Sequence, residues 1–207
     1  MSEILKKIHW LGHAGFRVDG SKTVYIDPFK IAVGPTADLV LSTHTHYDHY
    51  SPEDVKKISD GNTTLVVSKD ADPDFPGEVI KLSPGEEIEV KGMTVRATPA
   101  YNVEKQFHPK ASGWLGYLLT IDNGTIYHTG DSDFIPEMKG IVADVALVPI
   151  GGKFTMVAAE GARAVKAMDV KAAVPMHWGE IVGDESDARR FKELVGDAAN
   201  VVILKKE

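Results

Sequence analysis

The sequence predicts an α/β protein arranged as a four-layer αββα sandwich, in which two mixed β-sheets pack between outer helices. Two observations support this fold class: short strand-like segments fill the first two-thirds of the chain, and strands alternate with helices in the last third. Two packed sheets with helices outside bury the apolar face of every such element. A length of 207 residues suits one domain, and no linker or low-complexity segment divides it. We therefore expect residues 1–207 to form a single domain.

The first elements are short β-rich segments separated by glycine-containing turns. The expected strands here are residues 8–11, 16–19, 23–26 and 39–42. The last of these is a continuous apolar run, which is typical of a buried strand. A helix should begin after Ser51, because Ser51 is a suitable N-cap and Pro52 suits the first helical position.

The rest of the chain predicts further strands, two helices and one long loop. Strands are expected at residues 65–68, 79–82, 87–90, 93–98, 114–121, 125–129, 145–150, 172–176 and 201–204. Helices are expected at residues 156–168 and 185–195. Residues 99–113 form a long irregular stretch, and loops of this length inside a compact domain are commonly functional.

Composition narrows the function classes. The formal net charge is −7, from 23 basic and 30 acidic residues, and no basic run exists to hold a phosphate backbone. We therefore expect a small-molecule substrate rather than nucleic acid. Cysteine is absent, so a metal site has to use histidine and carboxylate ligands. No run approaches the ~18 apolar residues needed to span a membrane, and no signal peptide is visible, which predicts a cytoplasmic protein.

The segment His44-Thr45-His46-Tyr47-Asp48-His49 carries the strongest chemical signal in the sequence. Residues two apart in an extended segment point the same way, so His44 and His46 can share one ion. A turn in the loop lets Asp48 and His49 face a neighbouring position. Four N/O ligands at this density suit zinc or a similar first-row metal. A metal-free, histidine-rich surface loop is the alternative, but an apolar strand and a capped helix frame this segment too closely.

The motif His44-x-His46-x-Asp48-His49 after a buried strand resembles the signature of the metallo-β-lactamase-fold hydrolases. The other matching elements follow in the expected order: His108 in the long loop, Gly130-Asp131-Ser132 after one strand, and Pro175-Met176-His177 after another. Trp114-Leu115-Gly116-Tyr117 is similar to the compact lactonase-like and phospholipase D-like branch. The resemblance spans nearly the whole chain.

This resemblance implies two adjacent divalent ions, with Zn²⁺ expected and Mn²⁺, Fe²⁺ or Ni²⁺ as alternatives. The first ion would be held by His44, His46 and His108, the second by Asp48, His49 and His177, with Asp131 bridging them. Two such ions can lower the pKa of a shared water and provide hydroxide at neutral pH. Asp48 and Asp131 are the candidate catalytic residues, because either carboxylate could accept and return a proton. The expected reaction is hydrolysis of an ester, lactone or phosphodiester in a small molecule.

Some of these assignments have rivals. His128 could replace His108 as the third ligand of the first ion. It stands three residues before Asp131, so along a strand the two side chains would face opposite ways. We therefore favour His108 and expect His128 to be a strand histidine satisfied by hydrogen bonds. Asp131 could instead be a turn aspartate, and His177 a buried structural histidine.

Further residues are candidates for supporting roles. Asp27 ends a strand before Pro28, and we expect it to hold a ligand histidine in one orientation, although a plain Asp-Pro turn is a close rival. His13 could reach the mouth of the pocket, but a hairpin-turn histidine is the favoured interpretation. Lys153 lies in a glycine-containing loop and could contact an anionic substrate. Tyr101, Asn102 and Lys105 are further candidates for the same contact. For each of these four residues taken singly, an ordinary solvated loop residue is the favoured interpretation.

Two other functions compete with hydrolysis. Related folds hold a di-iron redox centre, but they usually carry a flavin domain and an additional acidic ligand where this sequence has Tyr47. A non-catalytic, metal-dependent binding module is the second alternative, and the complete ligand set argues against it. His177 follows Asp131 by only 46 positions, which leaves no room for the inserted domain of RNA-processing nucleases. The 30 residues after His177 are also too few for a helical substrate domain of the glyoxalase II type.

Overall fold

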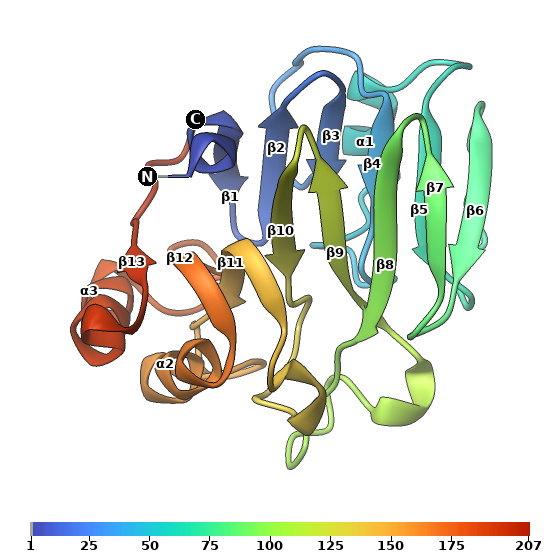
Figure 1. Cartoon of the computed structure of the whole chain (residues 1–207). Coiled ribbons are helices and arrows are strands. Elements are labelled where there is room, and N and C mark those ends of the chain that lie inside the picture. The colour runs from blue at the N-terminus through green and yellow to red at the C-terminus, as the bar shows by residue number, and fades with distance from the viewer. Residues whose placement is uncertain (1) are drawn as a thin grey trace.

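Two β-sheets face each other across the centre of the molecule (Figure 1), in a computed structural model that describes residues 2–207. The first sheet has six strands in the order β1-β2-β3-β4-β5-β6. Their bounds are β1 Ile8–Gly12, β2 Gly15–Asp19, β3 Thr23–Ile26, β4 Leu39–Leu41, β5 Thr64–Ser68 and β6 Glu78–Leu82. The first three strands run antiparallel, and the strands from β3 to β6 run parallel. This sheet is therefore mixed.

The second sheet has seven strands in the order β13-β12-β11-β10-β9-β8-β7. Their bounds are β7 Glu87–Val90, β8 Met93–Pro99, β9 Leu115–Ile121, β10 Gly124–His128, β11 Val142–Pro149, β12 Asp169–Met176 and β13 Asn200–Val201. Strands β7 to β10 are antiparallel, whereas β10 to β13 are parallel. The sequence explains this change. Short turns join β7 to β8 and β9 to β10 as antiparallel hairpins, whereas helices connect the later strands and allow them to run parallel.

Helices cover the outer faces of both sheets. The α-helices are α1 Pro52–Ile58, α2 Ala158–Ala167 and α3 Glu185–Val195, and the 3-10 helices are η1 Glu3–Lys7, η2 Lys110–Ser112, η3 Pro136–Met138 and η4 Gly196–Ala198. Helix α1 begins as expected, because the Ser51 side chain accepts a hydrogen bond from the Asp54 N–H. Helices α2 and α3 pack against each other and against β12. The architecture is the αββα sandwich that the sequence predicts.

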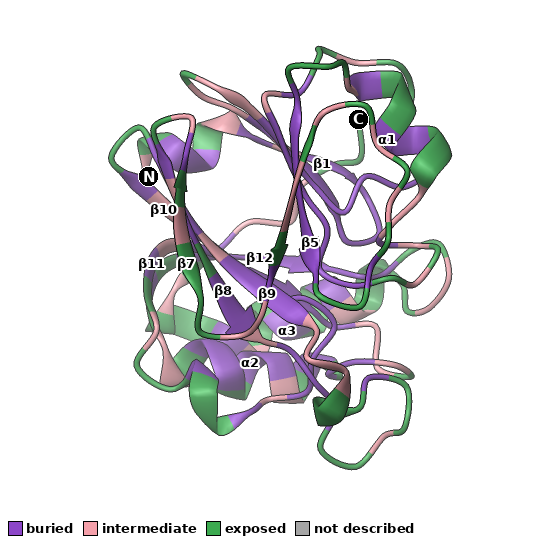
Figure 2. Ribbon diagram, turned by 90° about the vertical axis from the view of Figure 1, so that its right-hand side faces the viewer, coloured by how far each residue is buried: buried purple, intermediate pink, exposed green. Residues whose placement is uncertain are grey.

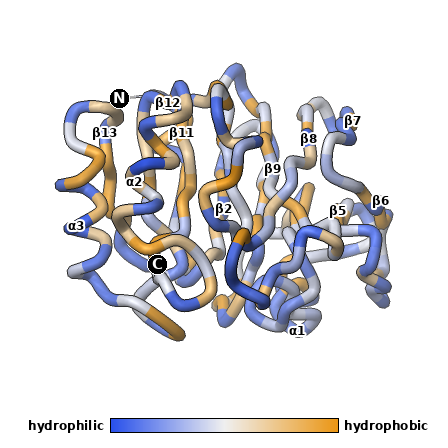
Figure 3. The backbone as a smooth tube through the Cα atoms, turned by 90° about the horizontal axis from the view of Figure 1, so that it is seen from below, coloured by the Kyte–Doolittle hydropathy of each residue, from blue (hydrophilic) through white to orange (hydrophobic). Residues whose placement is uncertain are grey.

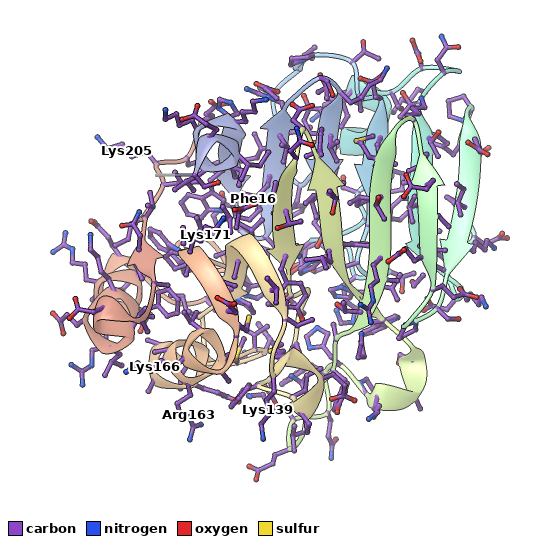
Figure 4. The ribbon with its side chains drawn as sticks, in the orientation of Figure 1. Phe16, Lys139, Arg163, Lys166, Lys171 and Lys205 are labelled. Carbon is purple, nitrogen blue, oxygen red and sulfur yellow. The ribbon has the colours of Figure 1, made fainter. Side chains whose placement is uncertain are left out.

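Successive side chains of a strand point to opposite faces of its sheet, so the buried residues form two apolar layers, one between the sheets and one under helix α1. Leu39 and Leu41 of β4 face the other sheet, whereas Val40 packs with Val55 and Ile58 of α1. The buried colour in Figure 2 concentrates between the sheets and on the inner sides of the helices. Figure 4 places Phe16 inside the sandwich, while the labelled lysines and Arg163 point outward. Hydropathy follows the same division, with apolar colour along the strands in Figure 3.

The predicted elements differ from the observed ones mainly at their ends. Strands β11 and β12 each begin three residues earlier than expected, at Val142 and Asp169. Helix α2 is shorter than the predicted 156–168, and β13 is limited to two residues. Exposed residues at the start of β11 and β12 carry little apolar signal, so pairing with the neighbouring strand decides these ends. Within residues 2–207, no helix has the length and apolarity that crossing a membrane requires.

Candidate metal centre

The predicted ligands come together at one edge of the sandwich, beyond the C-terminal ends of several strands. Residues 44–49 follow β4, His108 lies in the loop after β8, Asp131 follows β10, and His177 follows β12. Strands β8, β10 and β12 point in the same direction, so their following loops meet at the lower edge in Figure 1. Loops at the carboxyl ends of strands are where α/β folds commonly place their sites.

Asp131 lies at the centre of this group. Its Oδ2 is 3.0 Å from Nε2 of His177 and 3.3 Å from Nε2 of both His49 and His108. All four side chains are buried. Burial opposes ionisation of Asp131, but the His177 and His49 imidazoles hold the pKa of its carboxyl well below the usual range. The carboxylate is therefore the charged form at neutral pH.

Five buried polar atoms of this group have no hydrogen-bond partner: Nε2 of His49, His108 and His177, Nδ1 of His177, and Oδ1 of Asp131. Each of the three Nε2 atoms is close enough to Asp131 Oδ2 for a hydrogen bond, yet none is aligned for one. Buried atoms that stay unpaired cost about 1–3 kcal/mol each. Lone pairs that converge without bonding one another fit a bound cation, so the donor set suits a divalent metal.

A second set of nitrogen atoms lies beside the first. His44, His46 and His108 offer three donor atoms within 4.8 Å of one another, and His44 Nε2 is 3.0 Å from His46 Nδ1. The Trp114 ring packs against His44 and His46, at centroid distances of 4.8 and 4.7 Å. The predicted first ligand set is therefore close enough to share one ion.

Asp48 and His13 extend the opposite side of the cluster. Asp48, His49 and His177 offer donor atoms within 4.8 Å of one another, and His13 belongs to the same group. His13 Nε2 is 3.0 Å from Asp48 Oδ2, and the His13 ring lies 3.8 Å from that of His177. Burial disfavours the Asp48 carboxylate, but the hydrogen bond from His13 and the charge of His49 lower its pKa to about 2.

His13 is the hairpin-turn histidine that the sequence favours, but its side chain is buried within the cluster. It lies in the β1–β2 turn, and its side chain is fully buried rather than at a pocket mouth. Its backbone carbonyl accepts hydrogen bonds from the His177 N–H at 2.8 Å and from Trp10 Nε1 at 2.9 Å. One turn residue therefore contacts Asp48 through its side chain and His177 through its backbone.

Asp27 orients His49 from behind. Its Oδ2 lies 2.7 Å from Nδ1 of His49, and its two oxygens also accept from the N–H and hydroxyl of Thr43. Because the carboxylate only accepts, Nδ1 of His49 carries a proton, and Nε2 is the nitrogen that faces Asp131 and could bind a metal. This is the arrangement in which an outer carboxylate fixes the tautomer of a ligand histidine.

Three residues of the cluster have left-handed backbone conformations. The φ angles are +45° for Asp27, +49° for His13 and +61° for His177. Such conformations cost of order 1 kcal/mol or more for non-glycine residues, and they gather at sites where the surrounding structure imposes them. Here the hydrogen bonds of Asp27 and of the His13 carbonyl to neighbouring loops hold these turns in place.

The Asn102 side chain is hydrogen-bonded to His108 and does not face the cavity. Its Oδ1 accepts from both the backbone N–H and Nδ1 of His108, each at 3.0 Å. Its Nδ2 donates to Asp133 Oδ1 and to the Phe154 carbonyl. Asn102 is therefore neither the solvated loop residue that the sequence favours nor free to contact a substrate, because both ends of its amide are occupied inside the protein.

His128 is satisfied within the β-sandwich. Its Nε2 donates to the Ala14 carbonyl at 3.0 Å, and its Nδ1 accepts from the Gly130 N–H at 3.1 Å. The ring is buried and packs edge-on against Phe16. Of the two rival histidines, His108 is the one with a free nitrogen facing Asp131.

The basic residues proposed for substrate contact lie elsewhere. Lys105 pairs with Asp133, and the Tyr101 hydroxyl donates to Glu137. Lys153 is exposed, with its Nζ 4.9 Å from the centroid of the neighbouring Phe154 ring. It does not line the cavity above the cluster, so its place is that of the solvated loop residue that the sequence favours rather than of a substrate contact.

A cavity of about 200 Å³ opens above the cluster. Its floor is formed by His46, Asp48, His108, Asp131 and His177, and its walls by Tyr47, Phe107, Phe154 and Ile181. Tyr47 and Phe107 are 67% and 45% exposed, so the rim is open to solvent. The cluster is therefore accessible from one side while its ligand atoms stay buried.

Sequence reasoning missed the roles of Trp114 and Asn102. Asn102 lies inside the long loop 99–113 and Trp114 directly follows it, and Trp114 also donates to Asp70 through Nε1 at 2.8 Å. An amide oxygen can hold the Nδ1 proton of a histidine, but six positions along an irregular loop do not indicate which side chains meet. Trp114 is the first residue of the Trp114-Leu115-Gly116-Tyr117 motif, yet its packing against His44 and His46 exists only in the folded chain.

Comparison with known proteins assigns the chain to a family. Residues 7–177 match the model of the β-lactamase superfamily domain. A UPF0173 metal-dependent hydrolase from Pyrococcus abyssi is 35% identical over 219 residues, covering 96% of both chains. A crystal structure of a metal-dependent hydrolase from Parabacteroides distasonis superposes with a TM-score of 0.83 at 26% identity, covering 96% of this chain and 93% of that one. Igni18, a metallo hydrolase from Ignicoccus hospitalis, gives a TM-score of 0.76 at 23% identity, covering 96% and 94%, and shows the shared fold. The chain belongs to the UPF0173 metal-dependent hydrolases of the β-lactamase superfamily, and has the metallo-β-lactamase fold.

Proposed function

We propose that this chain hydrolyses an ester, lactone or phosphodiester bond in a small molecule, using two divalent ions, with zinc as the expected metal. One observation carries the proposal: three buried imidazole nitrogens surround one carboxylate oxygen of Asp131 at 3.0–3.3 Å without hydrogen bonding to it. Unpaired nitrogen and carboxylate atoms that converge at these distances suit a bound cation, which would supply the partner that they lack.

The proposed ligand sets follow the two halves of the cluster. His44, His46 and His108 would hold the first ion, and Asp48, His49 and His177 the second. Asp131 would be shared between them, since its carboxylate adjoins His108 of the first set and both histidines of the second. Histidine and carboxylate ligands without thiolate suit zinc, manganese, iron and nickel alike, so the metal has to be measured.

When bound, such ions polarise a carbonyl or phosphoryl oxygen and lower the pKa of water towards 7. The protein contributes the remaining chemistry through its carboxylates. Asp48 lines the cavity and its side chain is 14% exposed, so it is better placed than the buried Asp131 to exchange a proton with substrate. The hydrogen bond from His13 keeps that carboxylate in one orientation. We therefore assign proton transfer to Asp48 and the bridging position to Asp131.

Elemental analysis of protein purified without added metal tests the first part of the proposal. Two zinc ions per chain support a hydrolase, whereas two iron ions would favour the redox alternative. The second part is tested with p-nitrophenyl esters, lactones and bis-p-nitrophenyl phosphate. The His46→Ala variant should lose activity at least 100-fold, while Val103→Ala, an exposed change in the nearby loop, should retain it. Full activity of His46→Ala would show that the assigned site is wrong.

A further inference from the structure

We infer that the group beside the scissile bond of the substrate is uncharged and apolar, and that Phe107 and Phe154 select it. This inference rests on the proposed function and narrows its substrate class. It comes from the walls of the cavity rather than from its floor.

The walls of the cavity are apolar. Beyond the five predicted site residues on the floor, the lining consists of Tyr47, Phe107, Phe154 and Ile181. The rings of Phe107 and Phe154 meet edge to face with centroids 4.8 Å apart. This pair joins the long loop after β8 to the loop after β11, so the two rings form a continuous apolar wall.

No lysine or arginine among residues 2–207 lines this cavity. In the surrounding loops Lys105 pairs with Asp133 and Lys110 with Glu137, while Lys153 is exposed with its Nζ 4.9 Å from the Phe154 ring centroid. Sites that recognise phosphate groups generally present arginine, lysine or clustered backbone N–H groups to the non-reacting oxygens. These walls offer aromatic and aliphatic carbon instead, which suits an acyl or alkyl substituent.

The size and exposure of the cavity limit that substituent. A volume of about 200 Å³ is below the ~300–1,000 Å³ common for drug-sized ligands, so the substituent has to be small. Phe107 and Tyr47 are largely exposed apolar surfaces at the rim. A bound alkyl group would cover part of them, and each buried CH₂ contributes about 0.8 kcal/mol. Affinity should therefore rise with chain length until the cavity is filled.

The test compares p-nitrophenyl acetate, butyrate and hexanoate with zinc-loaded protein. We expect kcat/KM to rise about tenfold or more from acetate to hexanoate. In Phe107→Ala that hexanoate-to-acetate ratio should fall about tenfold, and Phe107→Leu should restore most of it. Val103→Ala is the matched control, because Val103 is exposed in the same loop but does not line the cavity. A ratio that Phe107→Ala leaves unchanged would overturn the inference, as would a preference for bis-p-nitrophenyl phosphate over every ester.

A binding measurement separates this inference from the proposed function. Calorimetry measures the binding affinity of acetate, butyrate and hexanoate, and therefore tests the apolar wall without any turnover. Tighter binding of hexanoate, lost in Phe107→Ala, would support the wall even if no ester were cleaved, in which case the hydrolytic proposal alone would fail. Equal binding of the three carboxylates would reject the apolar selection, whichever bond the protein cleaves.

Discussion

The Oδ1 atom of Asn102 accepts two hydrogen bonds from His108, one from its backbone N–H and one from Nδ1, each at 3.0 Å. Because an amide oxygen can only accept, Nδ1 of His108 carries the proton and Nε2 presents a lone pair towards Asp131. Asp27 acts in the same way on His49 from the other sheet. An amide oxygen and a carboxylate therefore hold the Nδ1 protons of two histidines, and each leaves Nε2 facing Asp131.

Removing the Asn102 side chain should weaken metal binding. We expect Asn102→Ala to lower the affinity for zinc about 10–100-fold, as changes to groups that orient ligands typically do. Competition with a chromophoric chelator measures this affinity, and circular dichroism checks the fold. Val103→Ala serves as the control because its side chain is exposed. An unchanged zinc affinity in folded Asn102→Ala would show that Asn102 does not orient a ligand.

His13 should control one ion more than the other. Its side chain contacts Asp48 and its carbonyl holds His177, both of which are assigned to the second ion. Asparagine tolerates the left-handed backbone at this turn, so His13→Asn keeps the carbonyl contact and removes the imidazole. We expect this variant to retain about one ion per chain after dialysis against a weak chelator, where the parent protein retains two. His9→Asn, a partly exposed neighbour paired with Glu207, should retain both ions; equal occupancy in His13→Asn would contradict the assignment.

His108 and His128 should respond in opposite ways to substitution by alanine. His108→Ala is expected to lose metal while its apo form keeps the stability of the parent apo protein. His128→Ala should keep its metal but lose about 2–4 kcal/mol of unfolding free energy, because the buried Ala14 carbonyl loses its partner and a cavity remains. Elemental analysis and urea unfolding provide the two measurements. Loss of metal from His128→Ala, with full metal in His108→Ala, would reverse the ligand assignment.

Asp54 should give a pH-dependent contribution to stability. It is buried and accepts from the Lys30 and Ile31 N–H groups and from Lys57, and although burial opposes ionisation, these contacts lower its pKa. A carboxyl with a lowered folded-state pKa stabilises the protein above its unfolded pKa of about 3.9, and that stability is lost as pH falls through the folded value.

We therefore expect Asp54→Asn to lower the unfolding free energy by about 1–3 kcal/mol at pH 6. The difference from the parent protein should shrink as the pH falls below about 4. Urea unfolding across this pH range measures the effect, and Glu53→Gln on the exposed side of the same helix is the control. A difference that stays constant down to pH 3 would rule out the carboxylate as its source.

The sequence by itself determined the strands and the central motif. Alternation and β-branched runs placed most elements within three residues of their observed bounds, and residues 44–49 stand together because they are neighbours along the chain. The resemblance to metallo-β-lactamase-fold hydrolases supplied His108, Asp131 and His177, which local pattern could not join to that motif. The structure brings these side chains together, while their role as ligands stays a prediction.

Only the tertiary structure decided which other residues reach the site and which do not. His13 contacts Asp48 across 35 positions, and Asn102 turned from a candidate substrate contact into the partner of His108. Lys153 lies outside the cavity, and Phe107 and Phe154 form its wall. The type of a residue determines which hydrogen bonds its side chain can form. The packing of the loops at the sheet edge determines where that side chain points. Several turns at that edge hold left-handed residues, and long-range hydrogen bonds impose those conformations.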